Sequence, residues 1–146
     1  MKSVSVIGTA KCDYRFCPIA ETVGSLIAKK GYVTISGGLG GIMKYCFKGA
    51  KNKDGLTVGI IPSYNKNDAN KYCDIVIPSG LGHARNILVV SSGDIVISIG
   101  GGYGTISEIA IALKLSKPVI SYESPIHHEN NFLDIDPFLI KINEVL

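Results

Sequence analysis

The chain has 146 residues, which suits one compact domain that buries about two thirds of the surface of its unfolded chain. Hydrophobic residues make up 46% of it and charged residues 18%, a balance that excludes a disordered chain. The net charge is only +3 and basic residues do not cluster, so the sequence has no electrostatic signature of nucleic-acid binding.

Six short apolar segments rich in β-branched residues are predicted to be strands. In chain order they cover residues 3–7, 32–36, 56–61, 74–77, 94–99 and 118–122. Their hydrophobicity is nearly continuous instead of alternating, which indicates a sheet covered on both faces.

Segments with helical character separate these strands. The clearest covers residues 19–30, where Val23, Leu26 and Ile27 recur at spacings of three and four and Gly31 supplies a stop. Further helices are predicted over residues 41–51, 83–92, 105–115 and 137–145. Strands alternating with helices predict an α/β, Rossmann-like fold with a doubly wound parallel sheet in three αβα layers, forming a single nucleotide-binding domain over residues 1–146.

Glycines gather where the predicted strands end. The turns after the second and fifth strands read "SGGLGGIM" and "IGGGYGTISE". Backbone N–H groups in such turns, together with a helix dipole, attract anions at the ligand-binding edge of a parallel sheet. Two glycine-rich turns on one edge favour phosphate or nucleotide binding. For either turn by itself, the alternative is that the glycines only permit a tight turn. The predicted ligand-binding residues are Gly8, Thr9, Gly37, Gly38, Gly40, Gly41, Met43, Gly101, Gly102, Tyr103, Gly104 and Thr105.

Three common motifs are missing from the sequence. The first strand is followed by "GTAK" instead of GxGxxG, no GxxxxGK[ST] string occurs, and there is no GxSxG elbow. These absences disfavour NAD binding, ATP hydrolysis and the simplest type of hydrolase.

The segments "SGGLGGIM", "ARN" and "GGGYGTISE" together resemble the lonely guy (LOG) family over roughly residues 4–122. The family signatures are a GGG-x-x-G-[LI]-M turn and a PGG-x-GT-x-x-E turn. Similar proteins include phosphoribohydrolases that cleave the N-glycosidic bond of nucleoside 5'-monophosphates, and a smaller protein that carries molybdenum cofactor. Although many members are labelled lysine decarboxylases, no residue here suggests pyridoxal phosphate.

The resemblance implies a small-molecule ligand, either a nucleotide or a pterin phosphate, and no required cofactor. Arg85 and Glu108 match the pair to which catalysis is assigned in the enzymes. Four positions depart from the family pattern, namely Ser36, Asn86, Gly100 and Ser107. These departures resemble the short branch near the molybdenum cofactor carrier. We therefore expect a phosphate-binding protein, with an N-glycosidase and a non-catalytic carrier of molybdenum cofactor as the two alternatives.

Glu108 has two interpretations. Thr105 and Glu108 form a T-x-x-E pattern before an apolar segment, which predicts a capping box. The resemblance instead implies a carboxylate beside a bound ribose. Arg85 is predicted at a helix start, where a cation opposes the helix dipole, so a ligand role is favoured for it.

The apolar segments "NILVVSSGDIVISI" and "ISEIAIALKL" predict a homodimer or higher homo-oligomer, with burial inside the monomer as the alternative. Cysteines 12, 17, 46 and 73 lack metal-finger spacing and are interpreted as free thiols. His127 and His128 are expected in a solvated loop, so no metal site is predicted. No signal peptide or membrane segment is evident, and we expect a cytoplasmic protein.

Overall fold

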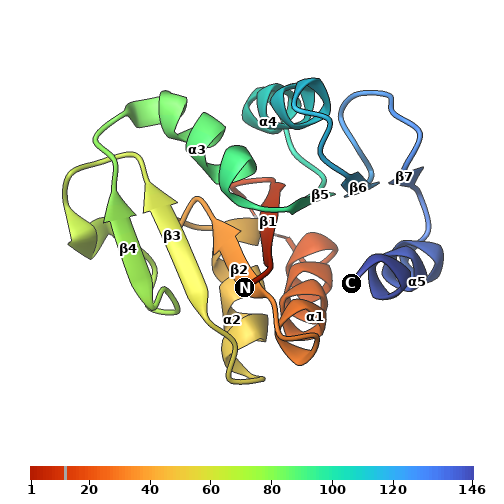
Figure 1. The fold of residues 1–146 in the computed structure, drawn as a ribbon, viewed down its shortest axis with the longest axis horizontal. Helices are drawn as coiled ribbons and strands as arrows, with labels where there is room; N and C mark the ends of the chain where they lie inside the picture. The colour runs from red at the N-terminus through yellow and green to blue at the C-terminus, as the bar shows by residue number, and fades with distance from the viewer. Residues whose placement is uncertain (12) are drawn as a thin grey trace.

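The computed structural model describes residues 1–11 and 13–146, so the predicted free thiol of Cys12 lies outside the described residues. Its sheet is parallel throughout, with the strands in the order β4, β3, β2, β1, β5, β6, β7 (Figure 1). The strands are β1 (Ser3–Gly8), β2 (Val33–Ser36), β3 (Thr57–Ile61), β4 (Ile75–Pro78), β5 (Ile95–Ile99), β6 (Val119–Tyr122) and β7 (Asn131–Phe132). The helices are α1 (Phe16–Lys29), α2 (Ile42–Lys51), α3 (Arg85–Ser92), α4 (Tyr103–Lys114) and α5 (Ile135–Val145), with 3-10 turns η1 (Lys66–Asp68) and η2 (Gly82–Ala84).

The strand order reverses direction once. The chain builds β1 to β4 outward on one side and then returns to place β5 on the other side of β1. Gly8 at the end of β1 is paired in register with Ile99 at the end of β5. The two neighbouring strands therefore send their following turns in opposite directions, and this reversal is where open α/β sheets bind ligands. The predicted doubly wound fold is confirmed.

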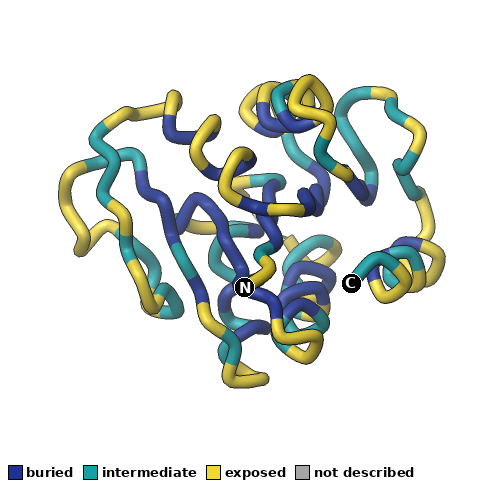
Figure 2. The backbone as a smooth tube through the Cα atoms, viewed as in Figure 1, coloured by how far each residue is buried: buried dark blue, intermediate teal, exposed yellow. Residues whose placement is uncertain are grey.

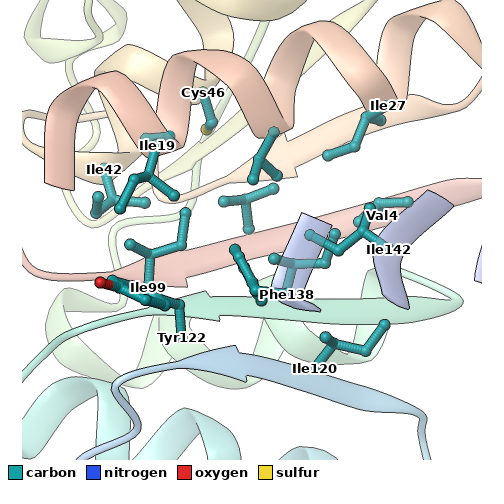
Figure 3. Close-up of a cluster of buried hydrophobic side chains, with 14 of the residues drawn as sticks. Val4, Ile19, Ile27, Ile42, Cys46, Ile99, Ile120, Tyr122, Phe138 and Ile142 are labelled. Carbon is teal, nitrogen blue, oxygen red and sulfur yellow. The ribbon is translucent and has the colours of Figure 1, made fainter. Parts of the chain in front are cut away.

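One hydrophobic core lies between the sheet and helices α1, α2 and α5. Val4 and Val6 of β1 point to this face because successive strand residues alternate between faces. Figure 3 shows Ile19 and Ile27 of α1 directed toward the strands. Phe47 and Phe138, from α2 and α5, are fully buried in the same cluster. This layer holds the sheet rigid beneath the strand ends.

A second, smaller core lies on the opposite face, beneath α3 and α4. Val90 and Ile109 from the two helices are fully buried there. The outer sides of α3 and α4 are exposed (Figure 2). Ile87 and Leu113 on these outer sides keep 50% and 41% of their surface exposed. The prediction that these segments carry surplus apolar surface is consistent with that exposure, whereas the predicted oligomer stays a prediction.

Several details differ from the sequence predictions. The two-residue strand β7 has no apolar run and was not predicted. The edge strand β4 was expected to be covered on both faces, but Ile75 and Ile77 are exposed because nothing packs over them. His128 was expected in a solvated loop, yet it is half-buried and its Nε2 lies 2.7 Å from Ser121 Oγ. Within the described part of the chain, no helix combines the length and the hydrophobicity needed to cross a membrane.

Candidate ligand-binding site

A cavity of about 680 Å³ lies at the carboxyl ends of β1, β2, β3 and β5, at the point where the strand order reverses. Its volume is in the range of small-molecule binding sites. The lining comes from the end of β1 and the turn after it, the β2–α2 turn, Pro62 after β3, the segment from η2 into α3, and the first turns of α4. Sequence segments that are far apart therefore meet around one space.

Most of the predicted site residues line this cavity. They are Gly8, Thr9, Gly37, Met43, Arg85, Gly102, Gly104, Thr105 and Glu108. The predicted residues that lie outside the lining are Gly38, Gly40, Gly41, Gly101 and Tyr103. Tyr103 in particular is 92% exposed at the start of α4. A ligand role for these five residues remains a prediction.

Two glycines of the β2–α2 turn are required by close contacts. A Cβ on Gly37 would lie 2.6 Å from Arg85 Nη2 and would also overlap Met43 Sδ. Gly41 has a φ of 62° and precedes α2, and a Cβ there would lie 2.5 Å from the carbonyl oxygen of Thr9. The same Thr9 oxygen accepts a hydrogen bond from the backbone N–H of Ile42 at 3.1 Å. At the start of α2, the carbonyl group of Thr9 therefore takes up one of the backbone donors that a ligand could otherwise use.

The start of α4 leaves its backbone donors to the cavity. Gly102 precedes the helix, and Ile106 N–H donates to the Gly102 carbonyl at 2.9 Å, which is the first intrahelical bond. The N–H groups before it have no intrahelical acceptor, because a helix leaves its first donors unpaired. No side chain caps this end, and Gly104 and Thr105 line the cavity. An anion at this position would meet these donors and the positive end of the helix dipole.

The predicted capping box is wrong. The helix begins at Tyr103, two residues earlier than expected, because the flexible backbone of Gly102 starts it there. Thr105 is therefore the third helical residue instead of the cap, and its Oγ1 packs against Gly101. Glu108 lies one turn farther into the helix, where it reaches no unpaired backbone donor of that end. Capping does not explain its carboxylate.

Arg85 is fixed by the protein at the first position of α3. Only 8% of its surface is exposed, and its Nε donates to the Ile60 carbonyl at 2.9 Å. Nη1 donates to Asn86 Oδ1, and Nη2 lies 3.7 Å from Met43 Sδ. These contacts hold the cation in the cavity wall. Burial lowers the pKa of the guanidinium, and the charge of Glu108 opposes that lowering.

Glu108 is a buried carboxyl group without a direct partner. Its surface is 8% exposed, and burial raises its pKa to about 7 although the charge of Arg85 opposes that rise. The ion pairs among the described residues are Arg15 with Glu123, Lys48 with Glu21 and Lys51 with Asp74, so Glu108 and Arg85 are not in direct contact. The two charges influence each other without forming an ion pair, and both side chains line the cavity.

Sequence reasoning assigned no ligand role to four polar residues of the lining, namely Lys11, Ser36, His83 and Asn86. Lys11 follows β1, and His83 precedes α3, and both are exposed at the cavity. Asn86 was noted only as a departure from the family pattern, but it is buried and orients Arg85. No signal short of the folded contacts could assign that role. Ser107, another departure, is exposed and bonds its own helix at the Gly104 carbonyl, so it lies outside the cavity.

Comparison with known proteins gives one family and several solved structures. The family model described as LDcluster4, the SLOG cluster4 family, matches residues 1–141. An uncharacterized protein of Archaeoglobus fulgidus is 52% identical over 126 residues, which cover 86% of this chain and 83% of that protein.

Two of the similar structures bind or carry molybdenum cofactor. The molybdenum cofactor binding protein of the phototrophic bacterium Rippkaea orientalis is 37% identical, with a TM-score of 0.81 over 99% of this chain and 86% of that one. The molybdenum cofactor carrier protein of Chlamydomonas reinhardtii is 29% identical, with a TM-score of 0.79 over 100% of this chain and 88% of that one.

Proposed function

The chain belongs to the SLOG cluster4 family, and we propose that it is a binding or carrier protein for a phosphate-bearing pterin of the molybdenum cofactor type. The observation that carries the proposal is one cavity whose lining includes the open start of α4 and the buried side chains of Arg85 and Glu108. Its similarity in sequence and fold to proteins described as binding or carrying molybdenum cofactor supports the choice of a pterin.

The charges of the cavity favour one orientation of such a ligand. The phosphate would sit at the start of α4, where Gly104 and Thr105 offer backbone donors and Lys11 supplies an exposed cation. A phosphate placed beside Glu108 would instead face a carboxylate whenever that group is ionised. The ring system would therefore lie against another part of the wall, which includes the apolar side chains of Val6, Ile7 and Leu39.

A phosphoribohydrolase is the second candidate, because Arg85 and Glu108 lie on the same cavity. Two features weaken it as the main proposal. The guanidinium of Arg85 is engaged with Ile60, Asn86 and Met43, so it has few donors left for a substrate. The lysine expected beside it in the enzymes is Asn86 here, so the cavity wall lacks that positive charge.

Loading experiments test the proposal. The purified protein would be incubated with molybdenum cofactor released from a molybdoenzyme, passed through gel filtration, and assayed for oxidised fluorescent pterin and for molybdenum in the protein fraction. We expect both to elute with the protein. A protein fraction that retains no pterin, from a sample that melts cooperatively, would contradict the carrier proposal.

A parallel assay tests the hydrolase alternative. Nucleoside 5'-monophosphates would be incubated with the protein and with its Glu108→Gln and Arg85→Ala variants, and released base would be measured by chromatography. The carrier proposal predicts no release. Release by the wild type that is lost in both folded variants would establish the hydrolase instead.

A further inference from the structure

Within residues 1–11 and 13–146, the buried carboxylate of Glu108 has no hydrogen-bond or ion-pair partner. Burial raises its pKa, and the charge of Arg85 opposes that rise. The fully buried polar side-chain atoms without a hydrogen bond among the described residues are Thr34 Oγ1 and Ser98 Oγ, so the oxygens of Glu108 are open to the cavity that it lines. A carboxylate on the wall of a ligand cavity can find its hydrogen-bond partner in the ligand. Such a ligand must offer N–H or O–H donors, because an ionised carboxylate only accepts.

Asn86 supplies the complementary group. The donor-only guanidinium of Arg85 contacts Asn86 Oδ1, and this contact fixes the amide so that its NH₂ points elsewhere. The side-chain Nδ2 lies toward α4, where a Cβ on Gly104 would be 3.7 Å from it. Asn86 and Glu108 are each only 8% exposed and both line the cavity. The cavity wall thus presents one neutral donor and one charged acceptor.

This pair of groups matches a specific ring edge. A 2-amino-4-oxopyrimidine ring, found in both pterins and guanine, carries a ring N–H and an adjacent NH₂ beside a carbonyl oxygen. We propose that Glu108 accepts hydrogen bonds from the ring N–H and the amino group of this edge, while Asn86 Nδ2 donates to its carbonyl oxygen. This assignment rests on the proposed function. Proteins that bind single bases read them in the same way, through hydrogen bonds to the polar edge of the ring.

The position of Glu108 along α4 supports this assignment. Thr105 and Glu108 are three residues apart and so share one helix face, with Glu108 about 4.5 Å farther along the helix axis. Both line the cavity, so the backbone donors and the carboxylate are available to different parts of one ligand. The other charged or titratable groups that line the cavity are Arg85, Lys11 and His83. Of these only Arg85 is buried, and it is held by contacts within the protein.

The test compares ligands that differ by one group. Binding of GMP, IMP and 2'-deoxy-GMP would be measured by calorimetry at pH 8, where Glu108 is ionised. IMP lacks only the 2-amino group, so the wild type should bind GMP at least about tenfold more tightly, the minimum expected for a hydrogen bond to a charged group. 2'-Deoxy-GMP should bind as GMP does. 6-Hydroxymethylpterin phosphate, measured in parallel, shows whether the natural ring is a pterin or a purine.

A matched pair of variants separates recognition from support of the fold. Glu108→Gln should bind GMP and IMP with nearly equal affinity, because its amide cannot accept from both donors. Glu144→Gln, at an exposed position of α5 outside the cavity, should keep the tenfold preference. A wild type that binds GMP and IMP equally, or a Glu108→Gln variant that still prefers GMP, would overturn the assignment.

Other outcomes distinguish the competing explanations. A loss of affinity for 2'-deoxy-GMP with no difference between GMP and IMP would place the carboxylate at the ribose and overturn the ring-edge assignment. If Glu108→Gln lowers the affinity for all ligands by the same factor, the carboxylate acts only as a counter-charge to Arg85, and the ring-edge assignment is overturned. If none of the phosphates binds, the proposed function itself fails, and the ring-edge assignment fails with it.

Discussion

Replacing Glu108 with glutamine should stabilise the protein at alkaline pH and have a smaller effect at acidic pH. The folded state raises the pKa of this carboxyl from an ordinary 4.5 to about 7, because burial penalises the charged form. That difference in pKa corresponds to about 3 kcal/mol of unfolding free energy.

The pH window follows from the direction of the shift. Between pH 4.5 and about 7 the folded protein retains a proton that the unfolded chain releases. The stabilising contribution of protonated Glu108 is therefore complete below pH 4.5 and is lost as the pH rises through about 7. Glutamine has no proton to lose. The stability of Glu108→Gln relative to wild type should thus increase by about 3 kcal/mol between pH 4.5 and pH 8, and then level off.

Urea unfolding at a series of pH values from 4.5 to 8.5 measures this difference. For a domain of this length, about 3 kcal/mol corresponds to a shift of roughly 6–12 °C in the melting temperature, so thermal unfolding can also detect it. All other titrating groups are shared by the two proteins and cancel when the curves are subtracted. Glu144→Gln serves as the control, because it makes the same substitution at an exposed residue outside the cavity.

A second variant tests the cause of the shift. The charge of Arg85 holds the pKa of Glu108 below the value that burial alone would give. Arg85→Met should therefore move the window in which stability is lost to higher pH. If the difference between wild type and Glu108→Gln stays constant from pH 4.5 to 8.5, Glu108 titrates normally and the reasoning from its burial is refuted.

Two further predictions concern packing and assembly. Gly37→Ala should lower stability by about 1–3 kcal/mol and weaken ligand binding, because its Cβ would displace Arg85 and Met43; unchanged urea unfolding would show that the turn relaxes freely. Wild-type protein should sediment as a homo-oligomer and Ile87→Glu as a smaller species, because Ile87 is an exposed apolar residue on α3; a wild-type monomer at micromolar concentration would count against this.

The fold could be predicted largely from the sequence because its buried strands are continuous runs of β-branched residues. The runs around Val4 and Ile97 have no polar interruption beyond small serines, and that pattern suits a sheet covered on both sides. Helix starts were harder to locate. Glycine permits a helix to begin wherever tertiary contacts favour it, so the T-x-x-E pattern pointed to a cap at Thr105 while α4 begins at Tyr103.

The site was predictable only in outline. Parallel topology brings the strand ends to one edge, which is why most of the predicted glycines do line the cavity. The pairing of Arg85 with Glu108 came from a family resemblance, since the two residues are distant in sequence. The contact of Arg85 with Asn86, and the unpaired state of Glu108, depend on side-chain rotamers and on burial between two helices. Neither the rotamers nor the burial can be predicted from the sequence pattern.

The spread of the cavity wall along the chain constrains when the protein can first hold a ligand. Its lining begins at Val6 in β1 and is completed only by Glu108 in α4, whereas α5 contributes none of it. Domains emerge from the ribosome N-terminus first, at about 5–20 residues per second. A nascent chain that has exposed only β1 to β4 has three of the cavity's turns but neither the α4 donors nor the acidic group. Under the proposed function, the chain can therefore bind its ligand only after α4 has emerged from the ribosome and packed onto the sheet.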